Sequence, residues 1–66
     1  MGIKHLKDLR QYLEKNAEQA FSRTELRDEL KQNHPTILDN IDYLVNIENT
    51  AEEIEGSPNK IKWKEN

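Results

Sequence analysis

The sequence predicts a small α+β fold in which three helices precede a C-terminal β-hairpin. Three observations predict it. Apolar residues recur at helical spacing up to about residue 47. From about residue 50 the pattern changes to the alternation of strands, interrupted by a turn-forming segment at 56–59. Between the first two helical segments, residues 22–25 carry the signature of a helix start.

Composition limits the chain to one domain. Its 66 residues are near the lower limit for a self-sufficient core, and without cysteine neither a disulfide nor a thiolate metal site can assist it. No apolar run is long enough to cross a bilayer, and the N-terminus lacks the apolar stretch of a secretory signal. We therefore expect a soluble, cytoplasmic protein with no membrane partner.

The first predicted helix spans about residues 3–15. It carries an apolar stripe at helical spacing, formed by Ile3, Leu6, Leu9, Tyr12 and Leu13. Asn16 is a suitable terminator, and the connector at 17–20 has no predicted structure.

The second predicted helix spans about residues 23–32. Ser22 and Glu25 form a capping box, in which each side chain bonds the other residue's backbone amide. Phe21 and Leu26 occupy the two positions of a hydrophobic staple, which sets the angle of entry.

The third predicted helix spans about residues 34–47. Asn33 or His34 is the expected N-cap, and Pro35 suits a first turn. The buried face is predicted from the spacing of Ile37, Ile41, Leu44 and Val45. Asn49 is expected to end the helix in the left-handed conformation.

The hairpin is predicted over about residues 50–64, with Ile54, Ile61 and Trp63 facing the core. The outward residues are acidic on the first strand and basic on the second, so cross-strand pairs are expected between Glu53 and Glu55 on one side and Lys60, Lys62 and Lys64 on the other. Ala51 and Ile54 do not share strand parity, which indicates a bulge or a late strand start.

This layout resembles the winged helix-turn-helix superfamily of DNA-binding domains over residues 3–64. The most specific segments are Phe21–Leu30 and Pro35–Leu44, which are similar to the family's second helix and recognition helix. Asparagines stand at 33 and 49, where the family usually has glycines. The resemblance implies that the third helix enters the major groove while the hairpin wing contacts the DNA backbone or minor groove.

Under this interpretation, Asn40 could bond an adenine edge, Thr36 and Tyr43 could reach phosphate or a thymine methyl, and an aspartate could accept from cytosine. Cations at the second helix and on the hairpin would contact phosphate. The candidate DNA-binding residues are Arg23, Thr24, Arg27, Thr36, Asp39, Asn40, Tyr43, Lys60 and Lys62. The alternative interpretation is that these residues form the ordinary solvated surface of the domain.

The charge distribution opens a second functional hypothesis. Residues 1–33 carry seven Lys or Arg against six Asp or Glu, whereas residues 34–66 carry three against seven, and no Lys or Arg lies between Lys31 and Lys60. This acidic stretch is unfavourable for contact with a polyanion. From the resemblance, the leading hypothesis is a small DNA-binding transcription regulator of archaeal, plasmid, phage or viral type, acting on double-stranded DNA and able to pair as a homodimer through helix 1 or Leu38. The alternative is a winged-helix module that binds a basic protein through the acidic face of helix 3, at Asp39 and Asp42.

Catalysis is not expected. The chain has no cysteine and no glycine-rich phosphate loop, and His5 and His34 match no metal-ligand spacing. We accordingly predict no enzyme activity, no metal and no cofactor.

Overall fold

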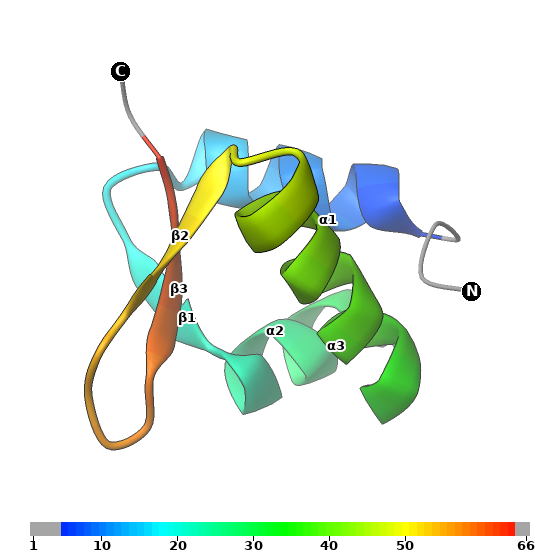
Figure 1. Ribbon diagram of the computed structural model, residues 1–66. Coiled ribbons are helices and arrows are strands. Elements are labelled where there is room, and N and C mark those ends of the chain that lie inside the picture. Colours follow the sequence, from blue (N-terminus) through cyan, green and yellow to red (C-terminus); the bar gives the residue numbers. More distant parts are fainter. Residues whose placement is uncertain (1–4, 65–66) are drawn as a thin grey trace.

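The computed structural model describes residues 5–64, which form three helices, a π-helical turn and three strands (Figure 1). In chain order the elements are α1 (Leu6–Lys15), β1 (Ala20–Ser22), α2 (Arg23–Leu30), α3 (His34–Asp42), η1 (Tyr43–Ile47), β2 (Ala51–Ile54) and β3 (Lys60–Trp63). The predicted α+β class is confirmed, and positions 3 and 4 of the predicted first helix lie outside the described residues. No helix within 5–64 is long and apolar enough to cross a membrane.

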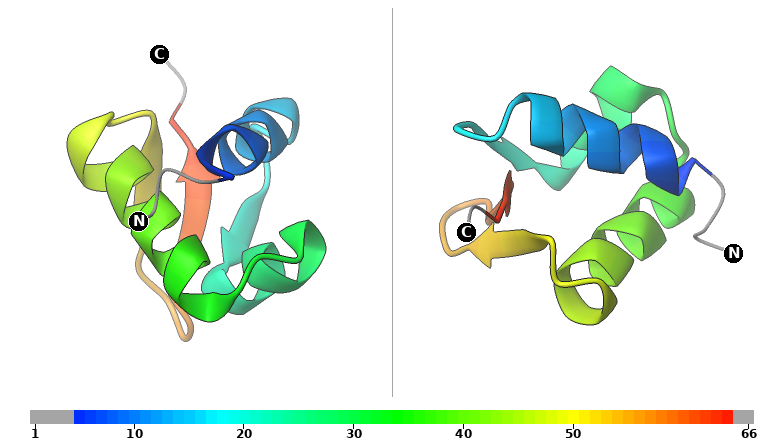
Figure 2. Two further views of the ribbon diagram at one scale, coloured as in Figure 1. Left: turned by 90° about the vertical axis from the view of Figure 1, so that its right-hand side faces the viewer. Right: turned by 90° about the horizontal axis from the view of Figure 1, so that it is seen from above.

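The molecule has two layers, a sheet and a group of helices on one of its faces (Figure 2). The strands are antiparallel in the order β1-β3-β2, so β3 is central. Between the layers lies an apolar core made of Leu6, Leu9, Leu13, Leu26, Ile37, Ile41, Leu44, Ala51 and Ile61. The helical stripes of the sequence thus predicted most of the core, while Val45 and Trp63 are half-buried at its edge.

The strand β1 was not predicted. Asn16 ends α1 by donating from its side-chain amide to the carbonyl of Tyr12 at 2.9 Å. The chain then runs into β1, where Phe21 lies opposite Ile61 of β3. Phe21 packs at the edge of the core that contains Leu26, so it has a role in the sheet as well as at the start of α2.

The two helix starts predicted from side-chain chemistry are confirmed. The Ser22 hydroxyl accepts from the Glu25 amide at 3.1 Å, and the Glu25 carboxylate accepts from the Ser22 amide at 2.8 Å. Asn33 caps α3 by accepting from the Thr36 amide at 3.0 Å. The second helix ends at Leu30 rather than 32, because Lys31 takes the left-handed conformation, with a φ of 54°. Lys31, and not Asn33, is therefore the left-handed residue of this turn.

The third helix changes character near its end. The predicted α-helix over 34–47 is α-helical only to Asp42 and continues as the π-turn η1. The Glu48 amide donates to the Tyr43 carbonyl, five residues earlier, at 2.8 Å. Asn49 follows with a φ of 61°, which confirms the predicted left-handed residue.

The register of the hairpin corrects three predictions. Ala51 lies opposite Trp63 and Glu53 lies opposite Ile61, so these residues share the face toward the helices. Ile54 therefore projects from the outer face, where it is 42% exposed, and the register runs without a bulge from Ala51 to Ile54. Glu53 has no lysine opposite it, whereas Glu52 lies opposite Lys62.

Candidate nucleic-acid interface

The pair α2 and α3 is joined by the three residues 31–33, and a buried polar link fixes its position against α1. The Gln32 side chain donates to the carbonyl of His5 at 3.1 Å and accepts from the Asn40 amide at 3.0 Å. Asn40 is fully buried and Gln32 is 6% exposed. The prediction that Asn40 lies on the exposed side of α3 and reads a base is therefore wrong. Position 40 borders the core stripe of Ile37 and Ile41, and its side-chain amide donates to Gln32 inside the protein.

Tyr43 also lies away from the outward face of α3. It is half-buried and packs against the core. Nearby, Arg10 of α1 donates two hydrogen bonds to Glu48, at 2.8 and 2.5 Å. These bonds raise the pKa of Arg10 above its ordinary value, with a smaller contribution from Tyr43. The predicted exposure of Tyr43 is therefore only partial.

The outward face of the third helix is acidic. Asp39 and Asp42 are exposed, and Asn46 donates to Asp42 at 2.6 Å. Beside them is a hollow of about 330 Å³ between α3, the start of α2 and β2, which we call the acidic hollow. It is lined by Arg23, Leu38, Asp39, Ile41, Asp42, Val45, Asn46 and Glu53. Three carboxylates and one guanidinium therefore surround a partly apolar surface.

The two arginines predicted to contact phosphate are both engaged. Arg23 donates to Glu53 at 3.0 Å, and this bond is the main reason why the pKa of Glu53 is lowered. Asn59 of the hairpin loop donates to the same Glu53 oxygen at 3.0 Å and accepts from the amide of Gly56 at 2.9 Å. The start of α2 is thereby tied to the hairpin loop. Arg27 donates to the neighbouring Asp28 at 3.1 Å.

Three lysines near these elements form no ion pair with any residue in 5–64: Lys31, Lys60 and Lys62. Lys31, which the sequence offered as a candidate cation near the turn, is exposed between α2 and α3. Lys60 and Lys62 project from the outer face of β3, as predicted. These lysines can therefore bind a new anionic partner without first breaking an ion pair to a described residue.

Along one edge of the molecule lie the start of α2, the start of α3 and the hairpin loop (Figures 1 and 2). Arg23 and Thr24 begin α2, Thr36 lies in the first turn of α3, and Lys60 follows the hairpin loop. These four predicted residues therefore belong to elements that reach the same edge of the molecule, which we call the loop end. Asp39 lies one turn further along α3.

Comparison of the chain with protein-family models, with curated proteins and with solved structures finds no match. Within residues 5–64, no group of three or more His, Asp or Glu side chains is placed to hold a metal ion.

Proposed function

We propose that this chain is a winged helix-turn-helix domain that binds double-stranded DNA with its loop end and acts as a small transcription regulator. One observation carries the proposal: the starts of α2 and α3 and the hairpin loop lie at one end of the fold. In helix-turn-helix proteins the N-terminal residues of the second helix contact base edges while the first helix crosses the backbone. In this proposal the hairpin, whose loop reaches the same edge of the fold, acts as the wing.

The charges of α3 favour a shallow entry into the groove. Its first turn, His34 to Thr36, carries no carboxylate, and the N-terminal end of a helix dipole favours negative charge such as that of phosphate. Asp39 and Asp42 follow roughly 7 and 12 Å further along the axis, at about 1.5 Å per residue. Contact through the first turn therefore keeps the aspartates toward the mouth of the groove, and Lys60, on the outer face of β3, supplies a positive charge that is in no ion pair with a described residue.

A titration followed by backbone amide NMR tests the proposal. A mixed-sequence DNA duplex is added at low salt, where phosphate contacts are strongest. We expect shifts in residues 23–24, 34–36 and 56–60 that disappear as salt is raised. An unmoved spectrum under these conditions, or shifts confined to α1, would exclude the proposed surface.

A pair of substitutions that removes negative charge sharpens this test. Asp39→Asn with Asp42→Asn removes two negative charges while keeping side-chain size. Because exposed charge interactions are each worth roughly 0.2–1 kcal/mol, we expect DNA binding to tighten at least about twofold at low salt. Glu18→Gln, in the connector after α1, is the matched control and should leave the affinity unchanged.

The acidic hollow favours a second candidate function, binding of a basic protein segment. Leu38 and Val45, which are half-buried, offer apolar contact, and Asp39, Asp42 and Glu53 offer carboxylates for a lysine or arginine. A synthetic amphipathic peptide bearing lysines is the probe. Here the double asparagine variant should weaken binding, so the sign of its effect separates the two candidates.

We also propose that two copies act together on DNA, since one such domain contacts only a half-site. The outer face of β2 offers Ile54 for such a contact, and Ile47 is 67% exposed at the end of η1. Sedimentation equilibrium with and without duplex should give a two-to-one complex, and Ile54→Ser should reduce it to one-to-one.

A further inference from the structure

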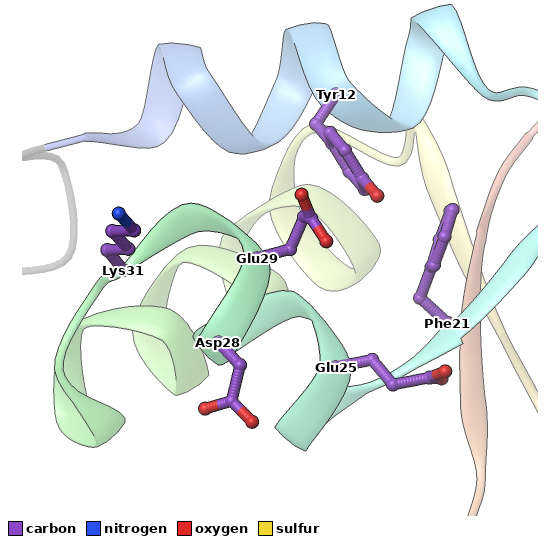
Figure 3. A pocket seen from close by; sticks show the side chains of 6 residues that line it. All are labelled: Tyr12, Phe21, Glu25, Asp28, Glu29 and Lys31. Carbon is purple, nitrogen blue, oxygen red and sulfur yellow. The ribbon is translucent and has the colours of Figure 1, made fainter.

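A second hollow lies on the other side of α2, between that helix, α1 and β1 (Figure 3). It has a volume of about 420 Å³ and is lined by Tyr12, Phe21, Glu25, Asp28, Glu29 and Lys31. We call it the aromatic hollow. It shares no residue with those that the DNA proposal places at the loop end.

Two aromatic rings form one side of this hollow. The ring of Tyr12 comes from α1 and that of Phe21 from β1, with centroids 5.1 Å apart and planes inclined at 52°. Both residues are half-buried, so part of each ring remains accessible to solvent. An inclined aromatic pair of this kind presents the electron-rich ring faces that attract cations.

Carboxylates from α2 stand opposite the rings. Figure 3 shows Glu29 beside Tyr12 and Glu25 beneath Phe21. Neither carboxylate is in an ion pair with any described residue. Burial raises the pKa of Tyr12, and the charges of Glu29 and then Glu25 add to this, which indicates that their field reaches the ring.

Two further charges line the hollow. Asp28 is engaged by Arg27. Lys31 stands at the opposite end from the aromatic rings in Figure 3 and repels a cation rather than competing directly for the rings. Glu25 also accepts the capping hydrogen bond from the Ser22 amide, whereas no hydrogen bond or ion pair joins the Glu29 carboxylate to a described residue. The surface around the rings therefore combines apolar contact with negative charge that is greatest at Glu29.

We propose that the aromatic hollow binds an organic ammonium group, seated against Tyr12 and Phe21 and neutralised by Glu29 and Glu25. The rings supply contact with the alkyl groups and cation–π attraction to the ammonium charge. Carboxylates at the rim disfavour an anion, and the absence of a cluster of oxygen ligands around one point disfavours a metal ion in the described part of the chain. The ammonium group belongs either to a small molecule or to a lysine side chain.

Choline and its neutral isostere 3,3-dimethyl-1-butanol form the matched pair of probes, because they share size and shape and differ in charge. With choline we expect saturable NMR shifts of the Tyr12 and Phe21 ring protons, with sodium chloride at equal ionic strength as the reference. Acetyl-Gly-Lys-Gly-amide is the third probe. Saturation by choline alone assigns a small molecule, and saturation by the peptide assigns a protein lysine. No saturation by either, or equal binding of the neutral isostere, overturns the proposal.

Variants with opposite expected signs complete the test. Glu29→Gln keeps size and removes charge, so the Kd of the bound probe should rise about two- to fivefold, as expected for an exposed charge contact. Lys31→Gln removes the repelling charge and should lower the Kd. Tyr12→Leu should abolish saturation, with circular dichroism checking that it folds. If Glu29→Gln and Lys31→Gln shift the Kd in the same direction, the ammonium assignment fails.

Discussion

Two polar links join distant parts of this molecule, and they differ in burial. The first connects α3 to α1 through Asn40, Gln32 and the carbonyl of His5, and its side chains are almost wholly buried. The second connects α2 to the hairpin loop through Arg23, Glu53 and Asn59, and about a third of the Arg23 and Glu53 side chains is exposed. The first link fixes the helix-turn-helix pair in place, whereas the second holds the hairpin with contacts that water or phosphate can replace.

The physical reason for this contrast is the cost of an unmade hydrogen bond. A buried polar group that loses its partner costs about 1–3 kcal/mol, because water cannot replace it. An exposed ion pair contributes only about 0–1 kcal/mol, because water can. We therefore expect the stability of the fold to depend on the buried link and the adaptability of the loop end to depend on the exposed one.

Breaking the buried link should have the largest effect. Asn40→Ala removes a packed side chain and leaves the Gln32 carbonyl oxygen without its donor, so we expect a loss of about 2–3 kcal/mol in the free energy of unfolding, measured by urea denaturation. Asn46→Ala, on the exposed side of the same helical segment, is the control and should change stability by less than about 0.5 kcal/mol. Equal losses in both variants would contradict the role assigned to burial.

The link between Arg10 and Glu48 is intermediate. Their side chains are 35% and 24% exposed, and two hydrogen bonds join them. Glu48→Gln keeps one acceptor and removes the charge, so we expect a loss of about 1 kcal/mol by urea denaturation. A loss of stability as large as that of Asn40→Ala would show that this link behaves energetically like the buried one.

Acid should act on the same link. Hydrogen bonds from Arg10 lower the pKa of Glu48 below its ordinary value of 4.5. A carboxylate with a lowered folded-state pKa contributes stability above its ordinary pKa and loses it as the pH falls through the folded-state value. Stability measured from pH 6 to 3 should therefore fall less steeply in Glu48→Gln than in the parent chain, and parallel curves would contradict this assignment.

Breaking the exposed link should have the smallest effect on stability. Glu53→Gln is expected to cost less than about 0.5 kcal/mol, because Arg23 becomes solvated. The same change frees a guanidinium at the loop end, so it should tighten low-salt DNA binding and increase its salt dependence. Gln11→Glu, on the exposed side of α1, is a suitable charge control far along the chain. Weaker DNA binding in Glu53→Gln would show that Arg23 matters through the hairpin it holds.

Local chemistry explains which parts of the fold were predicted from the sequence. Ser22, Glu25 and Asn33 bond backbone groups within a few residues, and Asn49 acts through its own left-handed backbone conformation, so their roles could be inferred from spacing alone. The apolar stripes of the helices predicted the core for the same reason. The strand β1 has three residues, and its partner β3 lies about forty residues away, so no local pattern marked it.

The site residues divide in the same way. Asn40 lies at the border of an apolar stripe, and only the position of Gln32 decides that its amide turns inward. Ile54 was assigned to the core from its hydrophobicity, yet the register set by Ala51 and Trp63 turns it outward. The aromatic hollow depends on the contact between Tyr12 of α1 and Phe21 of β1, on one side of α2. The sequence alone did not indicate this contact.

The π-turn Tyr43–Ile47 has an evolutionary consequence. Its carbonyl-to-amide closure spans five residues rather than four, so this segment holds one residue more than an α-helix of the same rise. Deleting one residue here would restore the four-residue hydrogen bonds of an α-helix and leave the segments on either side in place. A deletion within His34–Asp42 would instead rotate the buried apolar stripe of α3 away from the core. We therefore expect homologous chains to differ in length by one residue at 43–47 and to keep the length of α3 before it.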